Sequence, residues 1–173
     1  MIRRVSFSGK HLDLTEIDEH FKCTSTAIRE HPSPSSPTYT TRFFGYSSHE
    51  ISDKMQTCLG ELEKATTLSM FACIEANIRL DYLQRAYERR RDSLSRVMRN
   101  IHAQKSNNAS LTDDLLPAWK AQQRAPDALV NQLITAFKYR HWLAHGRYWT
   151  WKSGMIYDYY TVYSLANAFL GYM

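Results

Sequence analysis

Residues 126–146 read PDALVNQLITAFKYRHWLAHG, and their spacing predicts one amphipathic helix. Pro126 suits the first position of a helix, because the backbone N–H that it lacks has no partner in a first turn. Gly146 suits the position after the last turn, where glycine readily adopts the left-handed conformation. Apolar side chains recur at intervals of three and four residues and indicate one buried face: Leu129, Val130, Leu133, Ile134 and Phe137.

The chain upstream has the same helical pattern from Ser48 onward. Ser47 or Ser48 can cap a helix, and Thr66 or Thr67 can start another. No glycine or proline separates the two patterns, so two helices and one bent helix both remain open. The inward positions of these patterns are Ile51, Met55, Cys58, Leu59, Leu62, Phe71, Ile74, Ile78 and Tyr82.

Shorter elements complete the expected bundle. A basic helix is expected over residues 92–102, and a short helix over 113–122 is interrupted by Pro117. Residues 148–157 resemble two extended pieces around a glycine-containing turn, and Asp158 can cap a last helix. The sequence therefore predicts an all-α, up-and-down bundle of four to five helices with a small hairpin near 148–157.

The first 47 residues differ from the rest of the chain. Thr15 with Asp18 resembles an N-cap pair before a short helix that reaches about Glu30. Residues 31–38 hold three prolines and several serines, which indicates a linker or surface loop. We therefore expect a boundary near Ser47, with an N-terminal extension over 1–47 and a helical domain over 48–173.

Composition limits the class of protein. The chain has 173 residues and a mass of 20.2 kDa, and it is 43% hydrophobic with only 6 Gly and 5 Pro, which disfavours disordered and all-β proteins. The net charge of +5 permits a polyanionic partner without requiring one. No signal peptide or membrane-length apolar stretch is present, so we expect a soluble, cytoplasmic protein. Three widely spaced cysteines suggest neither disulfides nor a zinc knuckle: Cys23, Cys58 and Cys73.

Three cationic or titratable residues interrupt the apolar face of the helix over 126–145. Arg140, His141 and His145 fall within or at the edges of a stripe roughly 140° wide. A buried arginine needs a partner, so Arg140 can be a structural ion-pair donor, and His145 can simply favour the helix end. His141 and His145 have the spacing of zinc ligands, but no HExxH glutamate or third ligand accompanies them. We therefore expect neither a metal nor a cofactor.

The segment Arg140-His-Trp-Leu-Ala-His145 resembles the Arg-x4–6-His motif of the HEPN superfamily. That resemblance implies an all-α domain over about 48–173 that acts as a metal-independent endoribonuclease, typically a toxin or antiphage effector. It also implies a homodimer in which both motifs line one cleft, and it allows an antitoxin protein as a partner. Arg140 and His145 are then the central catalytic residues.

The chemistry of that pair suits RNA cleavage through the 2′-hydroxyl. Such a reaction needs a group that moves protons and a cation that stabilises the phosphorane. His145 can serve as general base or acid, because an imidazole titrates near neutral pH. Arg140 can present planar, permanently charged donors to the phosphoryl oxygens.

Two further residues are candidates for supporting roles in catalysis. His141 can contact phosphate or orient the cleft, or it can be a bystander. Glu75 lies on an otherwise inward face, where it can orient Arg140 or His145. An ordinary surface pair of Glu75 with Arg79 on the next turn is the equal alternative.

Basic and aromatic residues provide candidate contacts to RNA. Arg147 is expected to contact backbone phosphate. The resemblance places it at the position where some members of the HEPN superfamily carry a modified tyrosine. The other RNA-binding candidates near this helix end are Lys138, Tyr148 and Lys152. A basic run over residues 85–105 is either a solvated face or a source of phosphate affinity, and Asp81 with Arg85 is expected to be a surface pair.

Two other functions compete with RNA cleavage. One is a catalytically silent helical module that binds nucleic acid or a partner protein through the basic helix and the aromatic segment. The other is a zinc hydrolase built on His141 and His145. Loss of function on substitution of His145 would favour cleavage, whereas full activity in excess EDTA would exclude the zinc enzyme.

Overall fold

The computed structural model describes residues 4–152, 155 and 157–173, and all regular secondary structure within them is helical. This confirms the all-α prediction. A 3-10 turn at Ser106–Asn108 and a π-helical turn at Leu111–Leu115 accompany seven α-helices in the described residues. These are α1 (Leu14–Glu30), α2 (Tyr39–Phe43), α3 (Ser48–Glu88), α4 (Ser93–Lys105), α5 (Leu116–Ala121), α6 (Asp127–Ala144) and α7 (Tyr159–Leu170).

Helix α3 is the longest element and organises the fold. Its 41 residues run without interruption, so the two helical patterns in this part of the sequence form one helix. A capping box opens it, because the Ser47 hydroxyl accepts from the Glu50 N–H and the Glu50 carboxylate accepts from the Ser47 N–H. The helix ends at Arg89, whose φ of 54° places it in the left-handed region.

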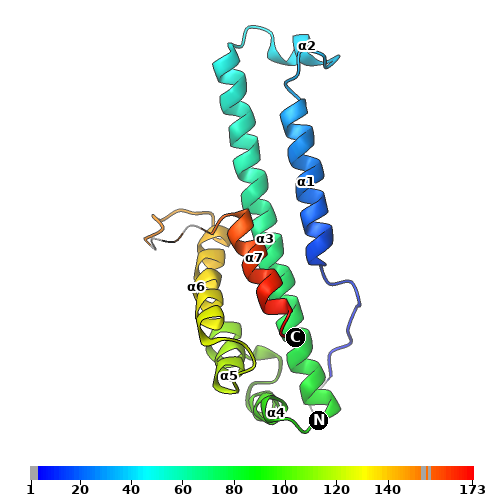
Figure 1. Ribbon diagram of the computed structural model, residues 1–173, viewed down its shortest axis with the longest axis vertical. Helices are drawn as coiled ribbons and strands as arrows, with labels where there is room; N and C mark the ends of the chain where they lie inside the picture. Colours follow the sequence, from blue (N-terminus) through cyan, green and yellow to red (C-terminus); the bar gives the residue numbers. More distant parts are fainter. Residues whose placement is uncertain (1–3, 153–154, 156) are drawn as a thin grey trace.

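The other helices lie around α3 (Figure 1). Helices α1 and α6 lie on opposite sides of it, and α7 packs against α3 between them. Helices α4 and α5 gather near the C-terminal end of α3. Beyond α7, the first half of α3 and the second half of α1 project together as a two-helix arm with α2 at its tip.

The core joins residues from most of these helices. Phe71 of α3 meets Phe137 of α6 with ring centroids 5.4 Å apart, and Trp119 of α5 meets Phe169 of α7 at 5.3 Å. Burying side chains of this size supplies most of the free energy that favours folding. The start of α1 belongs to the same core, because its residues Leu14 and Ile17 are buried there.

The start of α1 differs from its prediction. The cap is Asp13, whose carboxylate accepts from the N–H groups of Thr15 and Glu16, so the predicted Thr15 and Asp18 pair is wrong. Asp18 lies one turn inside the helix, where it accepts from Lys22 and from the hydroxyl of Tyr159. The proline- and serine-rich residues 31–38 form turns, as the sequence predicts.

The chain on either side of α6 is only partly as expected. Pro126 is the N-cap residue of α6, and Asp158 caps α7 by accepting from the Thr161 N–H at 2.8 Å. The predicted hairpin is not seen: its turn residues 153–154 and residue 156 lie outside the described residues, and the described residues beside them form no strand. Within the part of the chain that the structure describes, no helix combines the length and apolarity needed to cross a membrane.

Candidate functional site at the end of helix α6

The buried face of α6 is rotated from the one that the sequence predicts. Tyr139 and Leu143 are buried, whereas Ile134 is half-buried and Ala144 is exposed. The cause is the chain after α6, which covers that side of the helix with aromatic rings. Tyr139 lies at ring-centroid distances of 5.3 Å from Trp151 and 5.5 Å from Tyr157, both in the chain after α6, and 5.3 Å from Trp142 of α6 itself.

This rotation leaves His141 and His145 in solvent. Both side chains are exposed, and their ring centroids lie 4.2 Å apart with the planes tilted by 54°. Lys138 is exposed as well, and helical geometry places it only about 20° around the axis from His145. We call Lys138, His141 and His145 the α6 row, because they follow one another along a single exposed face.

Arg140 points elsewhere. Arg140 and His145 are five residues apart, so helical geometry separates their side-chain directions by about 140° around the axis. Arg140 therefore leaves the helix away from His145. Its guanidinium lies 3.8 Å from the Glu75 carboxylate of α3, and 40% of its side chain is exposed. The prediction that these residues interrupt a buried face is wrong for His141 and His145, which are exposed. Arg140 is half-buried and lies beside an acid of α3, as its structural ion-pair alternative expects.

Glu75 contacts two arginines at once. Its Oε1 atom accepts from Arg79 Nε at 2.8 Å, while Oε2 faces Arg140 at the longer distance. Arg79 also donates to the Ala109 carbonyl at 3.2 Å. Glu75 therefore forms the expected pair with Arg79 and also lies near Arg140. Through these contacts it connects the side of α3 to the last turns of α6.

Arg147 is engaged in an ion pair within the fold. Gly146 and Arg147 both have left-handed backbone angles, with φ of 79° and 58°, and they turn the chain back toward α3. The Arg147 guanidinium donates two bonds to the Glu61 carboxylate at 2.8 and 3.0 Å. These bonds, with a third from Lys64, lower the pKa of Glu61 to about 2. A phosphate would have to displace Glu61 before it could reach Arg147.

The aromatic segment divides into exposed and packed rings. Tyr148 is 82% exposed, and its ring lies roughly perpendicular to that of Trp149 at 4.5 Å between centroids. Trp142 instead donates its indole N–H to the Trp149 carbonyl at 2.6 Å, which holds the segment against α6. Lys152 is exposed. Tyr148 and Lys152 are therefore accessible to a ligand beyond the α6 row.

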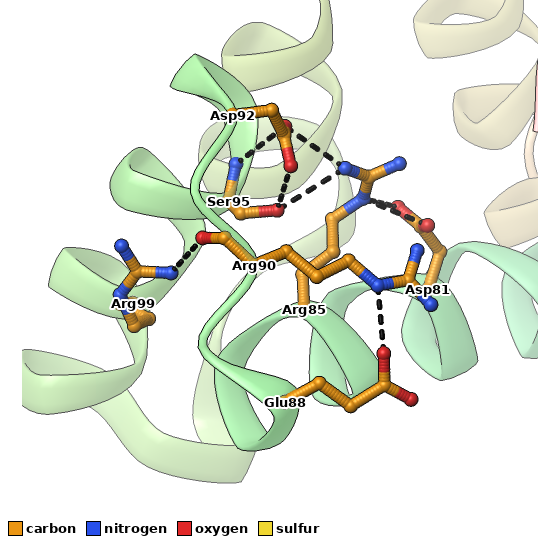
Figure 2. A network of polar contacts seen from close by, with 7 residues as sticks. All are labelled: Asp81, Arg85, Glu88, Arg90, Asp92, Ser95 and Arg99. Carbon is orange, nitrogen blue, oxygen red and sulfur yellow. Dashed lines mark hydrogen bonds and ion pairs between the residues drawn. The ribbon is translucent and has the colours of Figure 1, made fainter.

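The basic run over 85–105 is in part structural, and Figure 2 shows why. Arg85 is 4% exposed and donates to Asp81 at 2.7 Å, to Asp92 at 3.1 Å and to Ser95 at 3.2 Å. The predicted pair of Asp81 and Arg85 does form, but its expected place at the surface is wrong, because the left-handed turn at Arg89 brings Asp92 and Ser95 back over Arg85. That reversal depends on backbone geometry that the helical pattern does not reveal.

Two other arginines of this run form contacts where α3 ends and α4 begins, as Figure 2 also shows. Arg90 donates to Glu88 at 2.7 Å, and Arg99 donates to the carbonyl of Arg90. Four arginines of the run are exposed, Arg89, Arg90, Arg91 and Arg96, and of these Arg90 pairs with Glu88.

A hollow between α1, α3 and α7 was not expected from the sequence. It has a volume of about 460 Å³, and its lining includes Asp18, Glu63 and Tyr159. The Tyr159 hydroxyl donates to Asp18, and its backbone N–H donates to Glu63 at 3.1 Å. Asp18 has a lowered pKa, chiefly because Lys22 and Tyr159 bond to it. These partners lie about a hundred or more positions apart, so no local signal could have joined them.

Two observations complete the description of the site. Among the described residues, no group of three or more histidine, cysteine, aspartate or glutamate side chains is placed to hold a metal ion. Comparison with protein families, curated proteins and solved structures finds no match to this chain.

Proposed function

We propose that this protein is a metal-independent endoribonuclease that uses His145 and Arg140, and that it acts as a toxin or antiphage effector. The observation that carries the proposal is the exposed pair of imidazoles at the end of α6, with Lys138 on the same face. Two imidazoles and a cation in solvent at one helix end can move protons and attract phosphate. The match of Arg140 and His145 to the HEPN motif supports the same reaction.

The reaction assigns a role to each residue. His145 takes the proton of a 2′-hydroxyl, the 2′-oxygen bonds to phosphorus, and the bond from phosphorus to the 5′-oxygen breaks. A second imidazole, His141 or a histidine of a second copy, gives a proton to the leaving oxygen. Cations stabilise the phosphorane, which carries additional negative charge, and Arg140 presents donors that match its oxygens. The products are a 2′,3′-cyclic phosphate and a free 5′-hydroxyl.

A second copy of the chain gives Arg140 a place in this scheme. Within one chain, Arg140 and His145 leave α6 in different directions, so they do not readily enclose one phosphate. Two copies that pack near the ends of their α6 helices would bring the arginine of one toward the histidine of the other. We propose a homodimer with two composite sites, and a protein antitoxin is the corresponding means of restraint in the producing cell.

The test is RNA cleavage by purified variants. The parent, His145→Ala, Arg140→Ala and the control His49→Ala are incubated with a mixed RNA in excess EDTA. The proposal expects cleavage by the parent and the control, with a loss of about a hundredfold or more for the first two variants. Equal cleavage by folded His145→Ala protein would refute it.

A binding module without catalysis is the second candidate. The observation that favours it is the divergence of Arg140 and His145, together with exposed cations on α4 and the turn before it. In this case reversing the charge of Arg89, Arg91 and Arg96 abolishes RNA binding in a gel-shift assay, while His145→Ala binds as the parent does. The RNA remains uncut in every lane.

A further inference from the structure

His141 and His145 form an exposed chelating pair. They lie on successive turns at the end of α6, with ring centroids 4.2 Å apart. Within the described residues, the imidazoles that form a salt bridge or a side-chain hydrogen bond are those of His49 and His31, and neither belongs to this pair. Their ring nitrogens therefore have no protein partner among the described residues that would compete with a ligand from solvent.

The geometry suits a divalent transition-metal ion. Histidines four residues apart on a helix are the spacing that zinc-binding helices use. Two imidazole nitrogens that share a tetrahedral zinc ion, each about 2.0–2.1 Å from it, lie roughly 3.3 Å apart. Both side chains are exposed, so each ring can rotate toward a shared ion. Imidazole is a preferred ligand of Zn²⁺, Cu²⁺ and Ni²⁺.

We propose that His141 and His145 bind Zn²⁺ through one nitrogen each, with water in the remaining positions, and that the bound ion inhibits the protein. Catalytic zinc sites usually take three protein ligands, whereas this row supplies two. The ion would occupy the lone pairs that proton transfer needs, so binding and cleavage exclude one another. The inhibition rests on the proposed function, while the binding does not.

The binding test is a calorimetric titration of Zn²⁺ into the full chain after removal of metal with EDTA. The proteins compared are the parent, His141→Asn, His145→Asn, the double variant and the control His20→Asn, an exposed histidine of α1. Loss of an outer partner of a metal ligand already weakens binding about 10–100-fold, so loss of a ligand should weaken it at least as much. Exposed Cys23 and Cys58 are common to all five proteins and cancel from the comparison.

The outcomes separate this inference from the proposed function. Equal affinity of the parent and the double variant would overturn the metal site, as would a parent that binds no zinc. A parent that binds zinc through the pair but cuts no RNA would leave the metal site in place and refute the nuclease. If the parent cuts RNA, Zn²⁺ is expected to stop the cleavage and EDTA to restore it, and cleavage at saturating Zn²⁺ would contradict the inhibition.

Discussion

His145 owes its exposure to the turn that follows it. Its backbone N–H donates to the His141 carbonyl at 3.1 Å, which closes the last turn of α6, and Gly146 then takes a left-handed conformation. Arg147 is thereby directed to Glu61 on α3. The imidazole of His145 remains over His141, where a ligand from solvent can reach both rings.

The pair of Arg147 and Glu61 makes a prediction about pH. The pKa of Glu61 lies at about 2, below its ordinary value of 4.5, because Arg147 and Lys64 bond to the ionised carboxylate. A lowered pKa means that the pair stabilises the fold above pH 4.5, and that this contribution fades as the pH falls toward 2. In Arg147→Ala, the pKa of Glu61 should rise toward 4.5, as an NMR titration of the carboxyl carbon would report.

The control for this titration is Arg91→Ala, which removes an exposed arginine elsewhere. It should leave the pKa of Glu61 near 2. An unchanged Glu61 pKa in Arg147→Ala would mean that the ion pair is not formed in solution.

At the scale of elements, the junction of α3 and α4 depends on one buried arginine. Arg85 satisfies two carboxylates and a hydroxyl, so its removal leaves Asp81 buried without its cation. Breaking a buried ion pair by removing one partner costs about 3–5 kcal/mol. Arg85→Met should lower the free energy of unfolding by about that amount in urea denaturation. Arg91→Met should change it by less than about 0.5 kcal/mol, and equal effects would contradict the structure.

Helix α3 also contains a glycine at a position where the structure leaves room for a larger residue. Gly60 lies in the helix interior, and a Cβ atom built there meets no atom within 4 Å. Glycine in a helix costs about 0.5–1 kcal/mol relative to alanine. Gly60→Ala should therefore raise the free energy of unfolding by about that amount in the same urea experiment. A destabilised variant would show that α3 is not a continuous helix at this point.

The sequence predicted where helices begin better than it predicted which side of each helix is buried. Ser47 and Asp158 were identified as possible caps because capping needs only a local side chain and the next turn. The cap of α1 was missed by a few residues, since Asp13 and Thr15 are both acceptable candidates. The buried side of α6 could not be found, because the rings that bury Tyr139 come from a segment whose path has no periodic signal.

The sequence indicated some residues of the candidate site but not the long-range contacts that they form. The candidates form two separate pairs, Arg140 with Glu75 and His141 with His145, which lie on different sides of α6. The ion pair of Arg147 with Glu61 joins residues 86 positions apart, and no short-range pattern could indicate it.

At the scale of the whole molecule, the proposed composite site predicts complementation between inactive variants. Arg140→Ala and His145→Ala each lack one half, so each is inactive alone. Random mixing gives about half heterodimers, each with one intact site, so about a quarter of the parent activity should return. The measurement is RNA cleavage after the two proteins are unfolded and refolded together. No recovery in a mixture shown to contain heterodimers would exclude sites shared between chains.

Cleavage through the 2′-hydroxyl is tested by a substrate that lacks this group. The parent protein is incubated in excess EDTA with an RNA oligonucleotide and with its fully 2′-deoxy counterpart, and the product ends are identified by mass spectrometry. The RNA should be cut to fragments ending in 2′,3′-cyclic phosphate, and the deoxy strand should remain intact, because it lacks the attacking hydroxyl. Cleavage of the deoxy strand, or RNA that stays uncut at all protein concentrations, would contradict cleavage through the 2′-hydroxyl.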